Sequence, residues 1–330
     1  MQIRDSKSII IILVYAAVNG AIILLSLWQK PQDILEANKP GSLAPEYTVI
    51  ENLDYFHLKE NVPQLSLSAE QMRSQGEELA EFQRPRGVYN FQEKNKTIKY
   101  QALEALYKKA ADLLTLEKEV KLNSEEAEYQ ADKVKYYFKK DLVLASGGVK
   151  FDGVDPKSKD MLHIQSDKMR ANPNSQLSKF TGSVKGSMQR KKKYEGKTTF
   201  SSRELQLDGN QSLAHLDGDV VMKRESYLIT AGKADFFLEN YNKSLKYFVL
   251  NDDVKVTETL QTPEGVTERK AFSERLEGFG REQKMVLSGA PRVEYGKDVV
   301  KGYRITIREN VDLIEVDDAM SDLQMKRKKN

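Results

Sequence analysis

The chain of 330 residues contains no cysteine and only three histidines. Without cysteine there is no disulfide framework, no thiolate metal site and no cysteine nucleophile. His57, His163 and His215 lie far apart and do not have the spacing of metal ligands on one helix. We therefore expect no cofactor and no metal. His163 and His215 lie in alternating segments, where a surface or inter-strand position is expected.

Familiar catalytic motifs are also missing, since the sequence has no G-x-S-x-G, no P-loop and no G-x-G-x-x-G. The acidic pairs Asp252–Asp253 and Asp317–Asp318 fall in predicted strands, where neighbouring side chains point to opposite faces. Neither pair then converges on one substrate, as a glycosidase requires. The net charge is only +3, which does not suggest a nucleic-acid-binding surface. These absences predict that the chain is not an enzyme and binds no nucleic acid.

One stretch lacks charge altogether, from Ile9 to Trp28. As a helix it would be roughly 30 Å long, the thickness of a bilayer's hydrocarbon core. Arg4 and Lys7 precede it, so the positive-inside rule places residues 1–8 in the cytoplasm and the bulk of the chain across the membrane. The alternative is a cleaved signal peptide, for which the apolar run is long. We expect an uncleaved single-pass anchor, followed by a proline-containing linker at 29–48.

A short phrase recurs along the rest of the chain, seen in "ASGGVKF", "KFTGSVKG" and "HLDGDVVM". Its valines recur every 29 to 39 residues, at Val120, Val149, Val184, Val220, Val254 and Val293. Before the first five valines, position −4 holds Leu116, Ala145, Phe180, Leu216 and Leu250, and position −2 holds Lys118, Gly147, Gly182, Gly218 and Asp252. Position +2 holds Leu122, Phe151, Gly186, Met222 and Val256. The period of two predicts that these residues all point to one side of a strand.

Such a repeat predicts rungs of two or three strands that stack to bury an apolar face, as in a solenoid. The last unit carries Pro291 where glycine is expected and holds an extra residue, as a terminal bulge would. The segment at 99–120 is rich in helix-forming residues, so local propensity favours a helix there. The repeat frame nevertheless places Leu116 and Val120 in a strand, and we follow the frame.

Several stretches together resemble a known family. "VPQLSLSAEQM" at 62–72, "FQRPRGVYNFQE" at 82–93 and "IKYQALEALYKKAADLLTLEKEVKL" resemble the LptC family of lipopolysaccharide export, apart from Lys118 in place of the usual glycine. "YLITAGKADFFLENYNKSLKYFVLNDDVKVTE" and "VLSGAPRVEYGKDVVKGYRITIRENVDLIEV" resemble the OstA-like repeat of LptA. The resemblance implies an LptC-like part at 49–224, an LptA-like extension at 225–318 and a basic disordered tail at 319–330.

The fold implied is an all-β, elongated open β-jellyroll of stacked rungs, preceded by one transmembrane helix. The implied task is to accept lipopolysaccharide from an inner-membrane ABC transporter of the LptB/LptF/LptG type and to pass it to an LptA-type periplasmic bridge or to further copies of the same fold. Attachment to that bridge is expected at an exposed strand edge, either Val311–Val316 or Tyr303–Ile307. The alternative is an anchored envelope scaffold that carries no lipid.

The apolar face predicted above is then the candidate lipid groove. Its candidate residues are Leu65, Leu67, Leu116, Val120, Leu122, Ala145, Val149, Phe151, Phe180, Val184, Leu216, Val220, Met222, Leu250, Val254, Val256, Val293 and Tyr295. The glycines at position −2 would either leave room for lipid tails or allow the strands to twist.

Overall fold

The computed structural model describes residues 47–322, apart from positions 60–61, 77, 92–95, 156–158, 190–196, 225, 239–244, 263–264, 280–281, 283, 309–313 and 318–319. The expected anchor, with Ile9 and Trp28, lies outside the described residues, as does most of the linker. Within the described part of the chain, no helix has the length and apolar character needed to cross a membrane.

The described residues form a 22-stranded antiparallel sheet with one short 3₁₀ turn, η2, at Phe138–Lys140. The N-terminal strands are β1 Tyr47–Lys59, β2 Val62–Gln75, β3 Leu79–Gln83, β4 Arg86–Phe91, β5 Lys96–Gln101, β6 Glu104–Lys108, β7 Leu113–Asn123, β8 Ala127–Tyr137, β9 Leu142–Val154, β10 Met161–Asn172 and β11 Leu177–Gln189. The remaining strands are β12 Lys197–Asp208, β13 Leu213–Arg224, β14 Tyr227–Leu238, β15 Leu245–Thr262, β16 Gly265–Phe279, β17 Lys284–Ser288, β18 Arg292–Tyr295, β19 Asp298–Lys301, β20 Arg304–Arg308, β21 Ile314–Asp317 and β22 Met320–Asp322. The all-β expectation is thus confirmed, including strands rather than a helix at 99–120.

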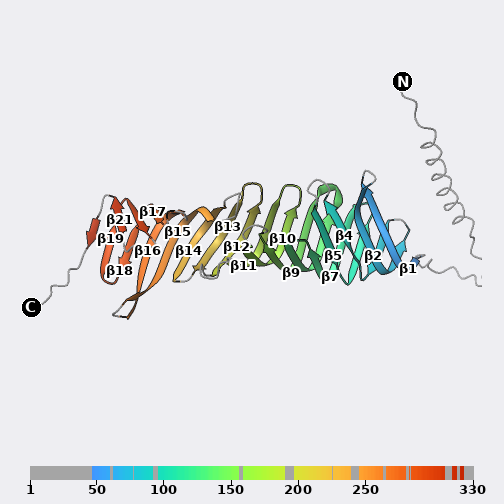
Figure 1. Ribbon diagram of the computed structural model, residues 1–330, viewed down its shortest axis with the longest axis horizontal. Coiled ribbons are helices and arrows are strands. Elements are labelled where there is room, and N and C mark those ends of the chain that lie inside the picture. Colours follow the sequence, from blue (N-terminus) through green and yellow to red (C-terminus); the bar gives the residue numbers. More distant parts are fainter. Residues whose placement is uncertain are drawn as a thin grey trace, which may run out of the picture. The chain divides into compact units, whose positions relative to one another are not determined.

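From β7 to β16 each strand pairs with the next one along the chain, and Figure 1 shows the strands following one another in sequence order. Tight turns produce this pattern. In the turn after β10 the side-chain oxygen of Asn172 accepts hydrogen bonds from the backbone N–H groups of Asn174 and Ser175, and Asp208 does the same after β12. Because such turns reverse the chain, each rung is a two-strand hairpin. This agrees with the two or three strands per rung that the repeat predicts.

Every second long strand contains a two-residue bulge near its middle, where both residues have positive φ. The pairs, with φ in degrees, are Lys118 and Glu119 (62, 52), Gly147 and Gly148 (81, 56), Gly182 and Ser183 (79, 46), Gly218 and Asp219 (78, 51), and Asp252 and Asp253 (68, 54). We call each pair a corner. A sixth corner, Gly289 and Ala290 (76, 52), separates β17 from β18 and precedes Pro291, in agreement with the irregular last unit.

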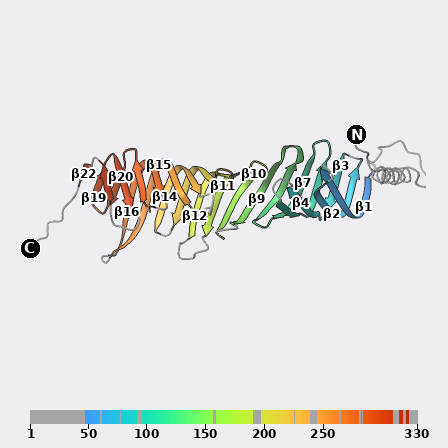
Figure 2. The same ribbon diagram turned by 45° about the horizontal axis from the view of Figure 1, so that its top comes forward.

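The corners fold the sheet into two layers (Figure 2). Layer A contains the first halves of β7, β9, β11, β13 and β15 and the second halves of β8, β10, β12, β14 and β16. Layer B contains the other halves of these strands. Layer A continues through β17, β20 and β21, and layer B through β4 and β5 at one end and β18, β19 and β22 at the other. The position four before each valine therefore lies in layer A and the valine in layer B, and both face the interior. The prediction that position −2 shares this face was wrong, because that residue forms the corner.

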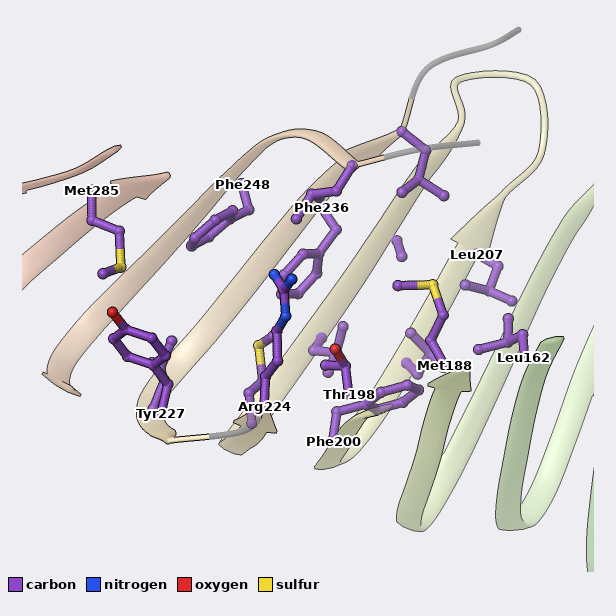
Figure 3. A pocket seen from close by; sticks show the side chains of 17 residues that line it. Leu162, Met188, Thr198, Phe200, Leu207, Arg224, Tyr227, Phe236, Phe248 and Met285 are labelled. Atoms are coloured by element: carbon purple, nitrogen blue, oxygen red, sulfur yellow. The ribbon is translucent and has the colours of Figure 1, made fainter. Parts of the chain in front are cut away.

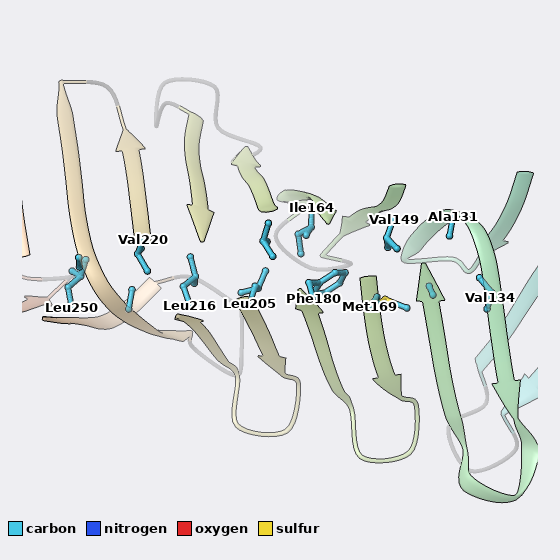
Figure 4. Packing of buried hydrophobic residues seen from close by; sticks show 14 of the residues in the cluster. Ala131, Val134, Val149, Ile164, Met169, Phe180, Leu205, Leu216, Val220 and Leu250 are labelled. Carbon is cyan, nitrogen blue, oxygen red and sulfur yellow. The ribbon is translucent and has the colours of Figure 1, made fainter. Parts of the chain in front are cut away.

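One hydrophobic core runs between the layers. In Figure 4, Val149, Ile164 and Val220 extend from layer B toward Phe180, Leu205 and Leu216 of layer A. The repeated valines are at most 1% exposed. The repeated phrase therefore builds the closed, tightly packed side of a two-layered trough.

The described ladder ends in strands that have a partner on one side only. At one end β1 pairs with β2; at the other, β21 pairs with β20 in layer A and β22 with β19 in layer B. Of the two expected attachment edges, Tyr303–Ile307 was wrong, because β20 is paired on both sides, with β17 and β21. Residues Met320–Asp322 form a strand, although the segment from 319 onward was expected to be disordered.

Candidate functional site

An apolar cleft lies between the two layers in the middle rungs, and we call it the central cleft. Its volume is about 260 Å³. Layer A contributes Leu205, Leu207, Ala214, Leu216, Phe236, Leu238, Leu245, Phe248 and Met285, and layer B contributes Leu162, Met188, Thr198, Phe200, Met222, Arg224, Tyr227 and Ile229. Figure 3 shows the labelled side chains converging from strands on both sides.

Strand alternation explains why these side chains converge. On β14, Ala234, Phe236 and Leu238 follow one another at steps of two and face inward, while Phe237 between them is exposed. The ring of Phe236 stacks on that of Phe248 from the neighbouring strand, with centroids 5.9 Å apart. Most of the lining is half-buried, so the cleft presents apolar surface to anything that enters it.

Arg224 is the one charged residue in the lining of the central cleft. It lies at the end of β13, two steps beyond Met222 on the inward-facing side, and its neighbours across the sheet are Thr198 and Tyr227. In Figure 3 its side chain extends from the layer B rim toward Phe236 of layer A. The chemical character of the cleft is therefore apolar with a single cation at the rim.

The same inward-facing row continues past the cleft with a buried ion pair. Glu258 of β15 and Arg269 of β16 lie directly opposite each other in the register. The Arg269 Nε donates to Glu258 Oε2 at 2.8 Å, and a second guanidinium nitrogen lies 2.6 Å from the same oxygen. Both side chains are only 9% exposed. The two charges satisfy each other, as charges buried in a protein interior must.

In the N-terminal rungs aromatic side chains fill the space between the layers. The hydroxyl groups of Tyr89 in layer B and Tyr136 in layer A are 2.6 Å apart, and Tyr136 donates to Asp141 at 3.0 Å. The rings of Tyr89 and Phe138 pack against Tyr136 at centroid distances of 5.1 and 4.7 Å. Burial, followed by the hydrogen bond between Tyr136 and Tyr89, raises the pKa of Tyr136, which keeps its hydroxyl protonated as a donor.

Two other pockets lie on the outside of the sheet, and charged residues make up about half of the lining of each. One surrounds the ion pair of Arg84 and Glu70 at the N-terminal rungs. The other lies among lysines on the outer face of layer A, where Lys133 pairs with Glu117 and Lys179 with Glu204. Charged, hydrated surfaces of this kind do not suit apolar chains.

The residues predicted for the groove mostly form the core beside the corners. Buried are Leu65, Leu67, Leu116, Val120, Ala145, Val149, Phe180, Val184, Leu216, Val220, Leu250, Val254, Val256 and Val293. Leu122, Phe151 and Met222 are half-buried, and Tyr295 is 42% exposed. Only Leu216 and Met222 of this set also line the central cleft. Contact between the predicted residues and lipid stays a prediction.

Sequence reasoning missed most of the cleft, including Leu162, Phe200, Phe236, Phe248 and Arg224. These residues lie away from the corners, and several are on the strands that lack the repeated phrase. A signal was present in β14, where "YLITAGKADFFL" alternates between apolar and polar residues.

Two of the histidines and one of the acidic pairs occupy structural positions. His163 contacts Asp152 of the adjacent strand through Nδ1, and His215 contacts Asp235 in the same way, both at 2.5 Å. Asp252 and Asp253 form a corner rather than a regular strand, and both are exposed. No cluster of potential metal ligands occurs among the described residues.

Two family models match the chain. Residues 13–189 match the one described as lipopolysaccharide-assembly, LptC-related, and residues 199–312 match the LptA/(LptD N-terminal domain) LPS transport protein. Curated protein sequences gave no match. Among solved structures, the chain is similar to the crystal structure of LptH, the LptA homologous periplasmic component of the conserved lipopolysaccharide transport device from Pseudomonas aeruginosa. The identity is 15% and the TM-score 0.35, and the alignment covers 39% of this chain and 95% of that chain.

The central cleft spans the junction between the two matched segments. Leu162 and Met188 belong to the first segment, whereas Phe200, Phe236 and Phe248 belong to the second. The strand ladder shows no break at this junction, because β11 and β12 pair along their whole length. Both matched parts therefore contribute to one cleft.

Proposed function

Because this chain belongs to the LptC-related family of lipopolysaccharide-assembly proteins, we propose that it conveys lipopolysaccharide across the periplasm and holds the acyl chains in the central cleft. The observation that carries the proposal is the half-buried apolar lining supplied by both layers. In this function the protein binds and passes on a lipid without chemical change, and it is not an enzyme.

The size and chemistry of the cleft support a lipid cargo. Moving apolar surface out of water contributes about 0.8 kcal/mol for each buried methylene. An engineered apolar cavity of about 150 Å³ already accommodates benzene. The central cleft is larger, at about 260 Å³, and it is partly open to solvent, as a moving lipid requires. Phe236 and Phe248 supply the apolar surface that acyl chains would contact.

The direction of transport follows from the proposed anchorage. We propose that residues 9–28 hold the chain in the inner membrane beside an ABC transporter of the LptB/LptF/LptG type, which supplies the energy. The β-strand unit then receives the lipid in the periplasm. At the other end, β21 and β22 leave backbone groups on one side without a described strand partner, which suits addition of a strand from an LptA-type bridge protein or another copy of this fold.

The matched LptC-related and LptA/LptD-type segments are parts of one chain. Covalent linkage makes the transfer between them intramolecular and raises their effective concentration without any new contact. We propose that this chain supplies both the membrane-proximal step and the first part of the bridge.

A photo-crosslinking experiment tests the proposal with a matched pair of positions. In cells that make lipopolysaccharide, the full-length chain carries a photoreactive phenylalanine analogue at Phe236 or at Phe237. Phe236 lines the central cleft, whereas Phe237 is on the outer face beside Tyr247, with ring centroids 5.6 Å apart. We expect lipopolysaccharide adducts at position 236 and not at position 237.

Absence of adducts at position 236 in a folded, membrane-located chain would overturn lipid transport through this cleft. The scaffold alternative, in which the chain carries no lipid, would then be favoured. Equal adducts at both positions would also contradict the proposal, because they would show contact without regard to the face of β14.

A further inference from the structure

The rim of the central cleft combines an apolar pocket with a cation. In layer B the inward-facing row runs across the strands through Leu162, Met188, Thr198, Arg224 and Tyr227, each opposite the next in the register. The row is apolar up to Met188 and becomes cationic at Arg224. A ligand that fills the cleft therefore meets a positive charge at one defined place on the rim.

Nothing in the described structure neutralises Arg224. Its guanidinium has no hydrogen bond or ion pair with any described residue, and the lining of the cleft contains no acidic side chain. The next acid in the inward row is Glu258, two strand spacings away, which is roughly 10 Å. Glu258 is already bound to Arg269 through two short contacts. The charge of Arg224 thus remains available to a ligand.

We infer that Arg224 binds an anionic group, a phosphate of the lipid cargo, while the acyl chains of the same molecule occupy the cleft. This inference rests on the proposed function and identifies the part of the site that recognises the head of the lipid. Arginine suits the role because its planar guanidinium donates two parallel hydrogen bonds to phosphate oxygens. The apolar surroundings strengthen the attraction, since the charges interact beside a region of low dielectric constant.

The position of Arg224 also fits the geometry of an amphiphile. Met222, two residues earlier on the same face, lies deeper in the cleft, while Arg224 is at the exposed end of β13. Figure 3 shows the guanidinium on the side of the pocket that faces Phe236. An acyl chain lying against Met222 and Phe236 would therefore place its polar head near Arg224.

The test uses the full-length chain in amphipol with the photoreactive residue at Phe236. The probes are lipid A, the phosphorylated glycolipid part of lipopolysaccharide, and lipid A from which the phosphates have been removed. With Arg224 in place we expect the phosphorylated probe to form adducts at about tenfold lower concentration than the dephosphorylated probe. This modest preference is appropriate to one partly solvated, charge-assisted hydrogen-bonded pair. Arg224→Gln should remove this preference, and Arg224→Lys should retain part of it.

Lys223→Gln is the matched control, because Lys223 is the exposed neighbour on the outward side of the same strand and the change removes the same charge. The preference should persist in this variant. A second photoreactive residue at Leu162, in layer B and so across the cleft from Phe236, should show the same pattern. Agreement between the two positions excludes a local effect of the Arg224 change on the crosslinker at position 236. Circular dichroism confirms that each variant is folded.

The outcomes separate the two proposals. An unchanged preference in Arg224→Gln, an equal loss in Lys223→Gln, or no preference when Arg224 is present would overturn the role of Arg224 while leaving lipid binding intact. If neither probe forms adducts with the chain that contains Arg224, the proposed function fails, and the role of Arg224 fails with it.

Discussion

At the scale of single residues, the corners show why glycine recurs in the repeated phrase. The first corner position has φ near +80° in Gly147, Gly182, Gly218 and Gly289, and the second has φ between 46° and 56°. The second position accepts Ser183, Asp219 and Ala290, because its φ lies where non-glycine residues are tolerated. A Cβ at the first position would also collide with a side chain of the preceding strand, as Gly147 would with Asp132.

Gly147 and Gly148 of β9 allow the first and second corner positions to be compared in one corner. We expect Gly147→Ala to destabilise the fold by about 1–2 kcal/mol from backbone strain, with an additional cost from contact with Asp132. Gly148→Ala should cost less, because its φ is +56° and its Cβ would meet nothing within 4 Å. Thermal unfolding of the two full-length variants, followed by circular dichroism, measures the difference. Equal effects would contradict the role assigned to the first position.

Sequence reasoning found the repeat but not the corner, and the reason is visible at Gly182. A period of two from Phe180 through Gly182 to Val184 is what a regular strand would show. The bulge preserves the inward facing of Phe180 and Val184 while it moves Gly182 out of the alternation. In the sequence the only sign of positive φ at the first corner position is the glycine itself. Even this sign is not constant, because Lys118 occupies the same position in β7.

At the scale of elements, cross-strand neighbours decide what the interior contains. The alternation of β15 places Val254, Val256 and Glu258 on the same inward-facing side, and only pairing with β16 brings Arg269 opposite Glu258. The sequence of β15 alone therefore did not reveal that Arg269 neutralises the charge of Glu258. The central cleft was missed for a related reason, since Phe236 and Phe248 come together only when β14 pairs with β15.

The ion pair gives a prediction about β15 and β16. Glu258→Leu alone leaves the Arg269 charge buried without its carboxylate, and we expect a loss of about 3–5 kcal/mol in the free energy of unfolding. The double variant Glu258→Leu with Arg269→Leu should recover most of this loss, because no buried charge remains. A double-mutant cycle from denaturant unfolding of the full-length chain measures the coupling. Additive effects of the two single changes would contradict a buried, coupled pair.

At the scale of the whole described unit, stability is distributed along the ladder. Each hairpin contacts its neighbours, so groups of rungs open at different free energies rather than in one transition. The N-terminal rungs contain the interior tyrosines with raised pKa values. Burial raises the pKa of Tyr129 to about 12, and burial together with the Asp112 carboxylate raises that of Tyr107 to about 12.

These tyrosines predict that the N-terminal rungs open first in alkali. A pKa raised by folding means that the unfolded chain releases the proton first, so the stabilisation is complete below pH 10 and is lost as the pH rises toward about 12. We expect amide exchange in β4–β8 to accelerate in this range before that in β10–β16. Tyr129→Phe should reduce the effect. Simultaneous exchange of all rungs, or no alkaline change, would contradict the prediction.

The hairpin ladder has a further consequence for the length of the molecule. Each repeat unit of 29 to 39 residues adds two strands, which lengthens the stack by about 10 Å. Because each strand from β7 to β16 pairs with the next one along the chain, one more unit or one fewer in this part leaves the register of the others unchanged. Gain or loss of whole units therefore adjusts the length of the ladder in fixed increments, without redesign of the remaining trough.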